Sequence, residues 1–360
     1  MGGCQHLACR LRSAFMAAGH GLEMREWLTP GGRRLSLTAL GFGTAPLGNY
    51  RRALSEAESD DIVTAALASG IRYFDTAPLY GLGLSETRVG RVLARHPREE
   101  YVLSTKVGRR LVPCAPEEVN AAIFVQTPQM RFEYDYSYDG VMRSYESSLQ
   151  RLGSDRVDIL FVHDVDAFSH GSRDASEARI RELVESGGWR ALDELRSSGA
   201  VAALGAGVNE WEPCARLLDL VDPDLFLLAG RYTLLEQAPL ETLFPRCMKR
   251  GVRIVIGGPY NSGVLAGKTT YNYAPVPAEV IERVRRIDAV CRAHGVPLNC
   301  AALQFVLAHP IVASVIPGSQ SVAENDANVA ALDAPIPASL WDELKRKNLL
   351  HADAPVPVAR

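Results

Sequence analysis

The chain has 360 residues, of which 47% are hydrophobic, and a formal net charge of −3 at pH 7. This apolar content is enough for a large core, and the small net charge gives no reason to expect nucleic acid or an anionic membrane as a partner. The seven cysteines are scattered and lack metal-ligand spacing, which predicts a reducing, cytoplasmic location. No apolar run approaches the roughly 20 residues that span a bilayer.

The first 23 residues differ from the rest of the chain. They carry Arg10 and Arg12, but no continuous apolar stretch of signal-peptide length follows. The regular pattern begins at Met24. We therefore predict a disordered N-terminal extension over 1–23, one domain over 24–345 and a C-terminal tail over 346–360.

Beyond Met24, short apolar runs rich in β-branched residues alternate with amphipathic stretches. The runs are almost continuously apolar, as in strands that are buried on both faces of a parallel sheet. They predict eight strands, over residues 37–43, 72–75, 101–106, 157–163, 202–207, 225–229, 253–256 and 313–316.

Helical stretches lie between these runs, and most of them stop at a glycine. Ser55 and Glu58 form a capping-box pattern at the start of the first one. The repeated order of helix, glycine and strand is typical of loops with glycine at the helix C-cap. The predicted helices cover residues 55–69, 86–94, 139–152, 189–198, 239–250 and 277–294.

Eight strands that alternate with helices fit either a closed barrel or an open doubly wound sheet. A dinucleotide-binding open sheet needs a Gly-x-Gly-x-x-Gly turn. Gly41-Phe-Gly43 and Gly205-Ala-Gly207 both lack the third glycine. We therefore predict an α/β fold of the (β/α)8 TIM-barrel type.

Two connecting segments exceed normal loop lengths. Residues 108–139 follow the third predicted strand, and residues 165–188 follow the fourth. In a barrel, both segments would hang over the C-terminal face, where active sites form. The first is rich in aromatic residues, so it is either a self-packed surface loop or a lid that stacks on a substrate.

Four polar residues lie at or just after the ends of neighbouring strands: Asp75, Tyr80, Lys106 and His163. Ionisable groups in these positions are costly unless they are paired or functional. Taken singly, Asp75 suits a turn, Lys106 a side chain that reaches solvent, and His163 a satisfied buried histidine. Because the carboxyl ends of barrel strands meet at one face, we expect the four side chains to converge.

Together these residues suit proton transfer at a substrate oxygen. A tyrosine has a pKa near 10, and a nearby ammonium lowers it. We therefore expect Lys106 to lower the pKa of Tyr80 and Asp75 to hold Lys106, while His163 binds the substrate oxygen. Tyr80 would be the general acid in a reduction or the general base in an oxidation, and a nicotinamide cofactor would carry the hydride.

The chain resembles the aldo-keto reductases from about residue 33 to about residue 332. The resemblance implies a (β/α)8 barrel and a catalytic tetrad at Asp75, Tyr80, Lys106 and His163. It rests on Leu-Gly-Phe-Gly-Thr (40–44), Tyr-Phe-Asp-Thr-Ala-Pro-Leu-Tyr-Gly (73–81), Gly-Leu-Ser-Glu (83–86), Leu-Ser-Thr-Lys (103–106), Arg-Leu-Gly-Ser-Asp-Arg-Val-Asp (151–158), Gly-Ala-Gly-Val-Asn (205–209) and Val-Ile-Pro-Gly-Ser (315–319).

Stretches 163–165, 229–235 and 257–263 look more narrowly like the aldose 1-dehydrogenase branch. That branch includes L-fucose, D-threo-aldose, D-arabinose and L-galactose dehydrogenases and pyridoxal 4-dehydrogenase. The resemblance implies oxidation of a cyclic hemiacetal such as an aldose to a lactone. Oxidation of pyridoxal, or NADPH-dependent reduction of an aldehyde or ketone, remains the alternative. The expected substrate contacts are Asp164, Tyr136 and Arg231.

The resemblance also implies a set of cofactor contacts, with Asn209 at the carboxamide. Gly257 stands where many family members have a stacking tyrosine, and Ala229 stands where a glutamine is common. Gly318 and Glu324 align with the lysine and arginine of NADP-preferring relatives. Because a carboxylate repels a phosphate but accepts hydrogen bonds from a ribose diol, we predict NAD, with NADP as the alternative. The expected contacts are Asn209, Gly257, Ser262, Gly263, Gly318, Ser319, Glu324 and Asn328.

Two rival classes of function remain. A non-catalytic barrel subunit would not need the tetrad, and a metal-dependent hydrolase would need histidines at strand ends, whereas His96, His294 and His309 lie in or beside helices. We therefore expect no metal. The chain lacks heptads, and it is expected to be a monomer or a small homo-oligomer with a small-molecule substrate.

Overall fold

The computed structural model describes residues 21–358, so residues 1–20 of the predicted extension lie outside the described part. Its centre is a parallel sheet of eight strands. In chain order these are β3 (Phe42–Gly43), β4 (Tyr73–Asp75), β5 (Val102–Val107), β8 (Ile159–His163), β9 (Ala203–Val208), β10 (Leu225–Ala229), β11 (Arg253–Gly257) and β14 (Val312–Ile316).

The sheet closes on itself. Neighbouring strands pair in the order β14-β11-β10-β9-β8-β5-β4-β3. Backbone bridges from Leu40 to Val315 and from Gly43 to Gly318 then join the first strand to the last. The predicted (β/α)8 barrel is confirmed.

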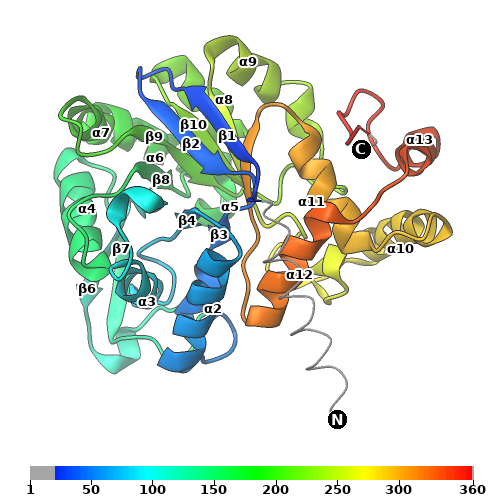
Figure 1. The fold of residues 1–360 in the computed structure, drawn as a ribbon. Coiled ribbons are helices and arrows are strands. Elements are labelled where there is room, and N and C mark those ends of the chain that lie inside the picture. Colours follow the sequence, from blue (N-terminus) through cyan, green and yellow to red (C-terminus); the bar gives the residue numbers. More distant parts are fainter. Residues whose placement is uncertain (1–20, 359–360) are drawn as a thin grey trace.

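Helices surround the barrel, as Figure 1 shows. Most of them connect one barrel strand to the next. They are α2 (Glu56–Ala68), α3 (Leu84–Leu93), α4 (Tyr138–Leu152), α5 (Ala167–His170), α6 (Arg173–Glu185), α7 (Gly188–Ser197), α8 (Glu212–Leu220), α9 (Leu243–Arg250), α10 (Ala278–Ala293), α11 (Leu298–Ala308), α12 (Val322–Asp333) and α13 (Ala338–Arg346).

The hairpin of β1 (Met24–Leu28) and β2 (Arg34–Thr38) covers the amino-terminal end of the barrel. Its apolar residues join the inner core. Trp27, Leu35 and Leu37 pack with inward-facing strand residues such as Tyr73 and Phe161. The alternate side chains of the strands face outward and pack against the helices. With one end of the barrel filled, the carboxyl ends of the strands are left for a binding site.

Several predicted boundaries were wrong. The first predicted strand, 37–43, is split between β2 and β3. Segment 108–139 carries the hairpin of β6 (Arg109–Pro113) and β7 (Met130–Tyr134). Segment 165–188 is largely helical, because Asp166 and Ser172 cap α5 and α6. Helices α8, α11, α12 and α13 were not predicted.

The residues that follow α13 pack against the barrel: Leu349, Leu350 and Ala354 are buried in the core. The predicted tail 346–360 is therefore packed at least as far as Ala354. In residues 21–358, no helix has both the length and the apolar character needed to cross a membrane.

Candidate active site

Asp75, Lys106 and His163 lie inside the barrel at the carboxyl ends of β4, β5 and β8. Side chains along a strand alternate between its two faces. Asp75 follows the inward-facing Tyr73 by two positions, and His163 follows Phe161 in the same way. Pairing of β4 with β5 and of β5 with β8 then brings the three side chains together.

The ammonium of Lys106 is fully buried, and it uses all three of its donors. Nζ donates to Asp75 Oδ2 at 2.7 Å, to the Thr76 carbonyl at 2.8 Å and to the Tyr80 hydroxyl at 3.1 Å. An ammonium has three N–H groups and no acceptor. Lys106 is therefore fixed in one position, and it links the carboxylate to the tyrosine as the sequence predicts.

A close approach between two loops sets the position of Tyr80. Gly81 has a φ of +65°, and a Cβ there would lie 2.4 Å from the carbonyl oxygen of Gly48. A Cβ on Gly48 would lie 2.5 Å from the carbonyl carbon of Tyr80. Only glycine fits at both positions. The pair lets the two loops touch, and Tyr80 is thereby held beside Lys106.

The expected lowering of the pKa of Tyr80 is not what the structure gives. Burial raises the pKa of Tyr80 well above its ordinary value, and the carboxylates of Asp75 and Asp164 raise it further, while Arg109 opposes them. Burial also raises the pKa of Asp75, against the attraction of Lys106. The prediction counted the ammonium but not the loss of solvent around the phenol.

His163 is neutral at ordinary pH. Burial lowers its pKa well below the usual value, and the positive charges of Arg109 and Lys106 lower it further. Nε2 lies 3.3 Å from Asp164 Oδ2. Nδ1 is buried and has no hydrogen-bond partner among the described residues. A neutral imidazole both donates and accepts hydrogen bonds, as contact with a reacting oxygen requires.

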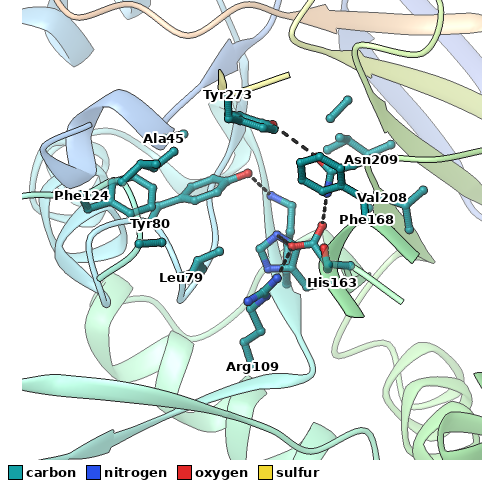
Figure 2. Close-up of a pocket in the computed structure, with 18 of the residues that line it drawn as sticks. Ala45, Leu79, Tyr80, Arg109, Phe124, His163, Phe168, Val208, Asn209 and Tyr273 are labelled. Carbon is teal, nitrogen blue, oxygen red and sulfur yellow. Dashed lines mark hydrogen bonds and ion pairs between the residues drawn. The ribbon is translucent and has the colours of Figure 1, made fainter. Parts of the chain in front are cut away.

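A cavity of about 270 Å³ opens directly over Tyr80, Lys106 and His163. Figure 2 shows the Tyr80 hydroxyl at this opening, with His163 and Asn209 across from it. Much of the wall is apolar or aromatic. The residues that give it this character are Tyr50, Leu79, Phe124, Phe168, Leu227 and Tyr273.

Two of these aromatic residues, Phe168 and Tyr273, and the charged Arg109 escaped the sequence analysis as pocket residues. Phe124 lies in the aromatic-rich segment 108–139, so composition pointed to its region. No sequence feature marked Tyr273 as a pocket residue. It lies at the tip of the hairpin of β12 (Thr270–Tyr271) and β13 (Ala274–Pro275), and its hydroxyl is 3.4 Å from Asn209 Oδ1.

The three predicted substrate contacts fall in different places. Asp164 lines the 270 Å³ cavity. Tyr136 lines neither this cavity nor the larger one described below, because its ring is fully buried and its hydroxyl donates to the His163 carbonyl at 2.7 Å. Arg231 also lines neither cavity, and its Nη1 donates to Asn272 Oδ1 at 3.0 Å. Tyr136 supports the strand that carries His163, and Arg231 supports the β12–β13 turn.

A second cavity, of about 860 Å³, adjoins the first and shares Tyr80, Ala229 and Tyr273 with it. It runs over the ends of β11 and β14 to the start of α12. Most of the predicted cofactor contacts line it: Gly257, Ser262, Gly263, Gly318, Glu324 and Asn328. Asn209 lines the smaller cavity instead, and Ser319 is buried behind the wall, where its hydroxyl accepts from Asn328 Nδ2 at 3.2 Å.

This larger cavity fits a nicotinamide dinucleotide. Its volume lies in the range of about 300–1,000 Å³ that is usual for ligand pockets. Gly263 has a φ of +102°, and a Cβ on it would collide with Lys268. Lys268 and the capped N-terminus of α12 supply positive charge for phosphates. The glycine turn leaves room for a dinucleotide, and Lys268 and the start of α12 would bind its phosphates.

Glu324 faces this cavity but is not free. Glu324 Oε1 lies 3.1 Å from Lys268 Nζ, and Oε2 accepts from the backbone N–H of Gln320 at 2.7 Å. Glu324 therefore has a structural role at the start of α12, and it also forms part of the cavity wall. Within residues 21–358, no group of three or more His, Cys, Asp or Glu residues could bind a metal.

A barrel whose C-terminal face carries this lysine–tyrosine–carboxylate cluster beside a dinucleotide-sized cavity defines an NAD(P)-dependent oxidoreductase. The chain belongs to the aldo/keto reductase family, whose model matches residues 39–349. This confirms the resemblance seen in the sequence.

Known relatives cover nearly the whole chain. It is 41% identical to a pyridoxal 4-dehydrogenase from Microbacterium luteolum, over 91% of this chain and 99% of the relative. It is 40% identical to a D-threo-aldose 1-dehydrogenase from a Pseudomonas species, over 88% and 95%. Among solved structures, an aldo-keto reductase from Bacillus halodurans in its holo form matches with a TM-score of 0.68 and 27% identity, over 92% of this chain and 98% of that one.

Proposed function

We propose that the protein oxidises the cyclic hemiacetal form of an aldose to a lactone, with NAD as the cofactor and Tyr80 as the general base. The observation that carries this proposal is the Lys106–Tyr80 hydrogen bond at the point where the two cavities meet. The D-threo-aldose 1-dehydrogenase relative supports the aldose as substrate.

Each tetrad residue has a distinct task in this proposal. A nicotinamide held in the larger cavity would supply the acceptor for the hydride of the anomeric carbon. Tyr80 accepts the proton of the anomeric hydroxyl, and the carbonyl of the lactone forms as the C–H and O–H bonds break. Lys106 stabilises the negative charge on the Tyr80 oxygen, and Asp75 orients Lys106. Neutral His163 donates a hydrogen bond to the substrate oxygen.

Pyridoxal is the second candidate substrate. The aromatic side chains around the smaller cavity favour it, since Phe124, Phe168 and Tyr273 offer flat faces for a planar ring. The pyridoxal 4-dehydrogenase relative points the same way. Pyridoxal also forms a cyclic hemiacetal, so the same proton and hydride transfers would serve both substrates.

The preference for NAD rests on Glu324. This carboxylate faces the larger cavity and would repel a 2′-phosphate, while a free ribose diol could donate to it. The Lys268 ammonium beside it offsets part of its charge. Reduction of an aldehyde or ketone with NADPH is the alternative that this arrangement disfavours.

The test is to follow reduced nicotinamide by absorbance with L-fucose, D-arabinose, L-galactose and pyridoxal, each with NAD and with NADP. Tyr80→Phe should lower kcat by about 100-fold or more, because general acid–base groups contribute about 10²–10⁴. The matched control is Tyr138→Phe, which removes a surface hydroxyl bonded to Glu194. Equal activity of Tyr80→Phe and wild type would refute the role of Tyr80.

A further inference from the structure

Arg109 is a buried arginine that lines the smaller cavity but is no part of the tetrad. It is the first residue of β6 and is 6% exposed. Its guanidinium carbon lies 4.8 Å from the ring centres of both Phe132 and Tyr134. Burial of a cation at this point is expensive unless it is paired. The two rings of the hairpin therefore pack against the guanidinium at the cavity wall.

The partner of Arg109 is Asp164, which also lines the cavity. Arg109 Nη2 donates to Asp164 Oδ2 at 2.7 Å, and Asn209 Nδ2 donates to Asp164 Oδ1 at 2.9 Å. Arg109 Nε is buried and has no hydrogen-bond partner among the described residues. The carboxylate has acceptor capacity beyond these two contacts. Both residues line the cavity, and the pair retains unused donor and acceptor capacity.

The backbone conformation of Asp164 and the burial of its ion pair with Arg109 both cost free energy. Asp164 adopts a left-handed φ of +51°, which aspartate tolerates but does not prefer. A buried ion pair is weak evidence for stability, because desolvation offsets much of the attraction. Strained residues and buried charges gather at functional sites. A substrate role explains why the chain carries both costs at one point of the cavity.

We propose that Arg109 and Asp164 bind the hydroxyl on the carbon next to the anomeric carbon, so that the substrates are aldoses with a C2 hydroxyl. This rests on the proposed function. Asp164 Oδ2 lies 3.3 Å from Nε2 of His163, the residue that we propose donates a hydrogen bond to the reacting oxygen. An adjacent oxygen of the substrate therefore falls beside Asp164. A hydroxyl donates to the carboxylate and accepts from the guanidinium, which satisfies both groups.

The test compares sugars that differ only at C2: D-arabinose with 2-deoxy-D-ribose, and L-fucose with 2-deoxy-L-fucose. Wild type should prefer the hydroxylated sugar by about 100-fold or more in kcat/KM, because a site built for a hydroxyl rejects the analogue that lacks it. Arg109→Lys keeps the charge but loses the planar fork, and Asp164→Asn tolerates the left-handed backbone. Each variant should reduce the kcat/KM preference for the hydroxylated sugar to less than about tenfold.

Arg110→Lys is the matched control. Arg110 is the next residue of β6, pairs with Glu133 and does not line the cavity. It should keep the wild-type preference. If Arg109→Lys and Asp164→Asn lower kcat/KM equally for both members of a sugar pair, the two residues only support the fold and the proposal is overturned. A wild type that oxidises both sugars equally well also overturns it.

A binding measurement separates this proposal from the proposed function. Calorimetric titration of each sugar into the enzyme with NADH measures binding without turnover. Selective binding of the hydroxylated sugar that weakens in Arg109→Lys supports the hydroxyl site even if no sugar is oxidised, and oxidation would then be the part that failed. Oxidation of sugars with no difference in binding leaves the proposed function intact and removes the hydroxyl site.

Discussion

The buried ion pair between Lys106 and Asp75 allows a quantitative test of the site. Nζ and Oδ2 are 2.7 Å apart, and the two side chains are 1% and 2% exposed. Lys106→Met keeps an unbranched side chain of similar length but removes the charge. Asp75 then keeps the Ser104 hydroxyl, 2.7 Å from Oδ1, as its side-chain donor. Breaking a buried pair in this way costs about 3–5 kcal/mol.

This cost converts into a melting temperature. Unfolding entropy is about 2.1 cal/mol/K per residue, so a chain of this length loses about 0.75 kcal/mol per degree near its Tm. Lys106→Met should therefore melt about 4–7 °C below wild type at neutral pH. The double variant Asp75→Asn/Lys106→Met leaves no buried charge unpaired, and it should recover at least about half of that deficit.

The loss of melting temperature in Lys106→Met should also depend on pH. Burial raises the pKa of Asp75, and Lys106→Met removes the charge that opposes this shift. A carboxyl whose folded pKa exceeds its unfolded value of about 3.9 adds stability at low pH and loses it as the pH rises. Thermal melts should show a smaller deficit at pH 5 than at pH 8. An equal deficit at both pH values, unchanged in the double variant, would refute this reasoning.

Three further predictions follow from the same structure. Because burial raises the pKa of Tyr80, kcat/KM for oxidation should climb about tenfold per pH unit from pH 7 towards pH 10, and a plateau below pH 8 would contradict this. Burial lowers the pKa of His309 to about 4, so the free energy of unfolding should fall between about pH 6.5 and 4 by up to about 1.4 kcal/mol per unit. In chemical denaturation, His309→Asn should show a shallower decline than wild type. Glu324→Gln should lower the NAD-to-NADP ratio of kcat/KM by about tenfold, and an unchanged ratio would remove Glu324 from cofactor selection.

The catalytic cluster was predictable because its geometry is local to the strands. Asp75 and His163 end apolar strands, and a period of two fixes the face on which each side chain lies. Once a barrel is inferred, strand order brings them together. The pKa of Tyr80 was not predictable in the same way, since its direction depends on how much solvent the surrounding loops exclude.

Arg109 and Tyr136 show what the sequence left undetermined. Both lie in segment 108–139, whose hairpin was not predicted. Whether a side chain there faces the cavity depends on how the hairpin folds back over the barrel. Arg109 enters the wall because Phe132 and Tyr134 stack against it, whereas Tyr136 turns inward to the His163 carbonyl. Aromatic composition left a self-packed loop and a lid both open, and it did not show which side chains would face the cavity.

Burial, together with the charges of the site, explains why the proposed oxidation should require alkaline conditions. Two carboxylates, Asp75 and Asp164, and two cations, Lys106 and Arg109, surround the reacting residues. Burial is the largest cause of both pKa shifts, upward for Tyr80 and downward for His163. The carboxylates add to the shift at Tyr80, where Arg109 opposes them, and the two cations add to the shift at His163. Both side chains are therefore neutral at pH 7. A neutral tyrosine cannot accept the proton of the anomeric hydroxyl, so the proposed oxidation should become faster as the pH rises and more of Tyr80 is deprotonated.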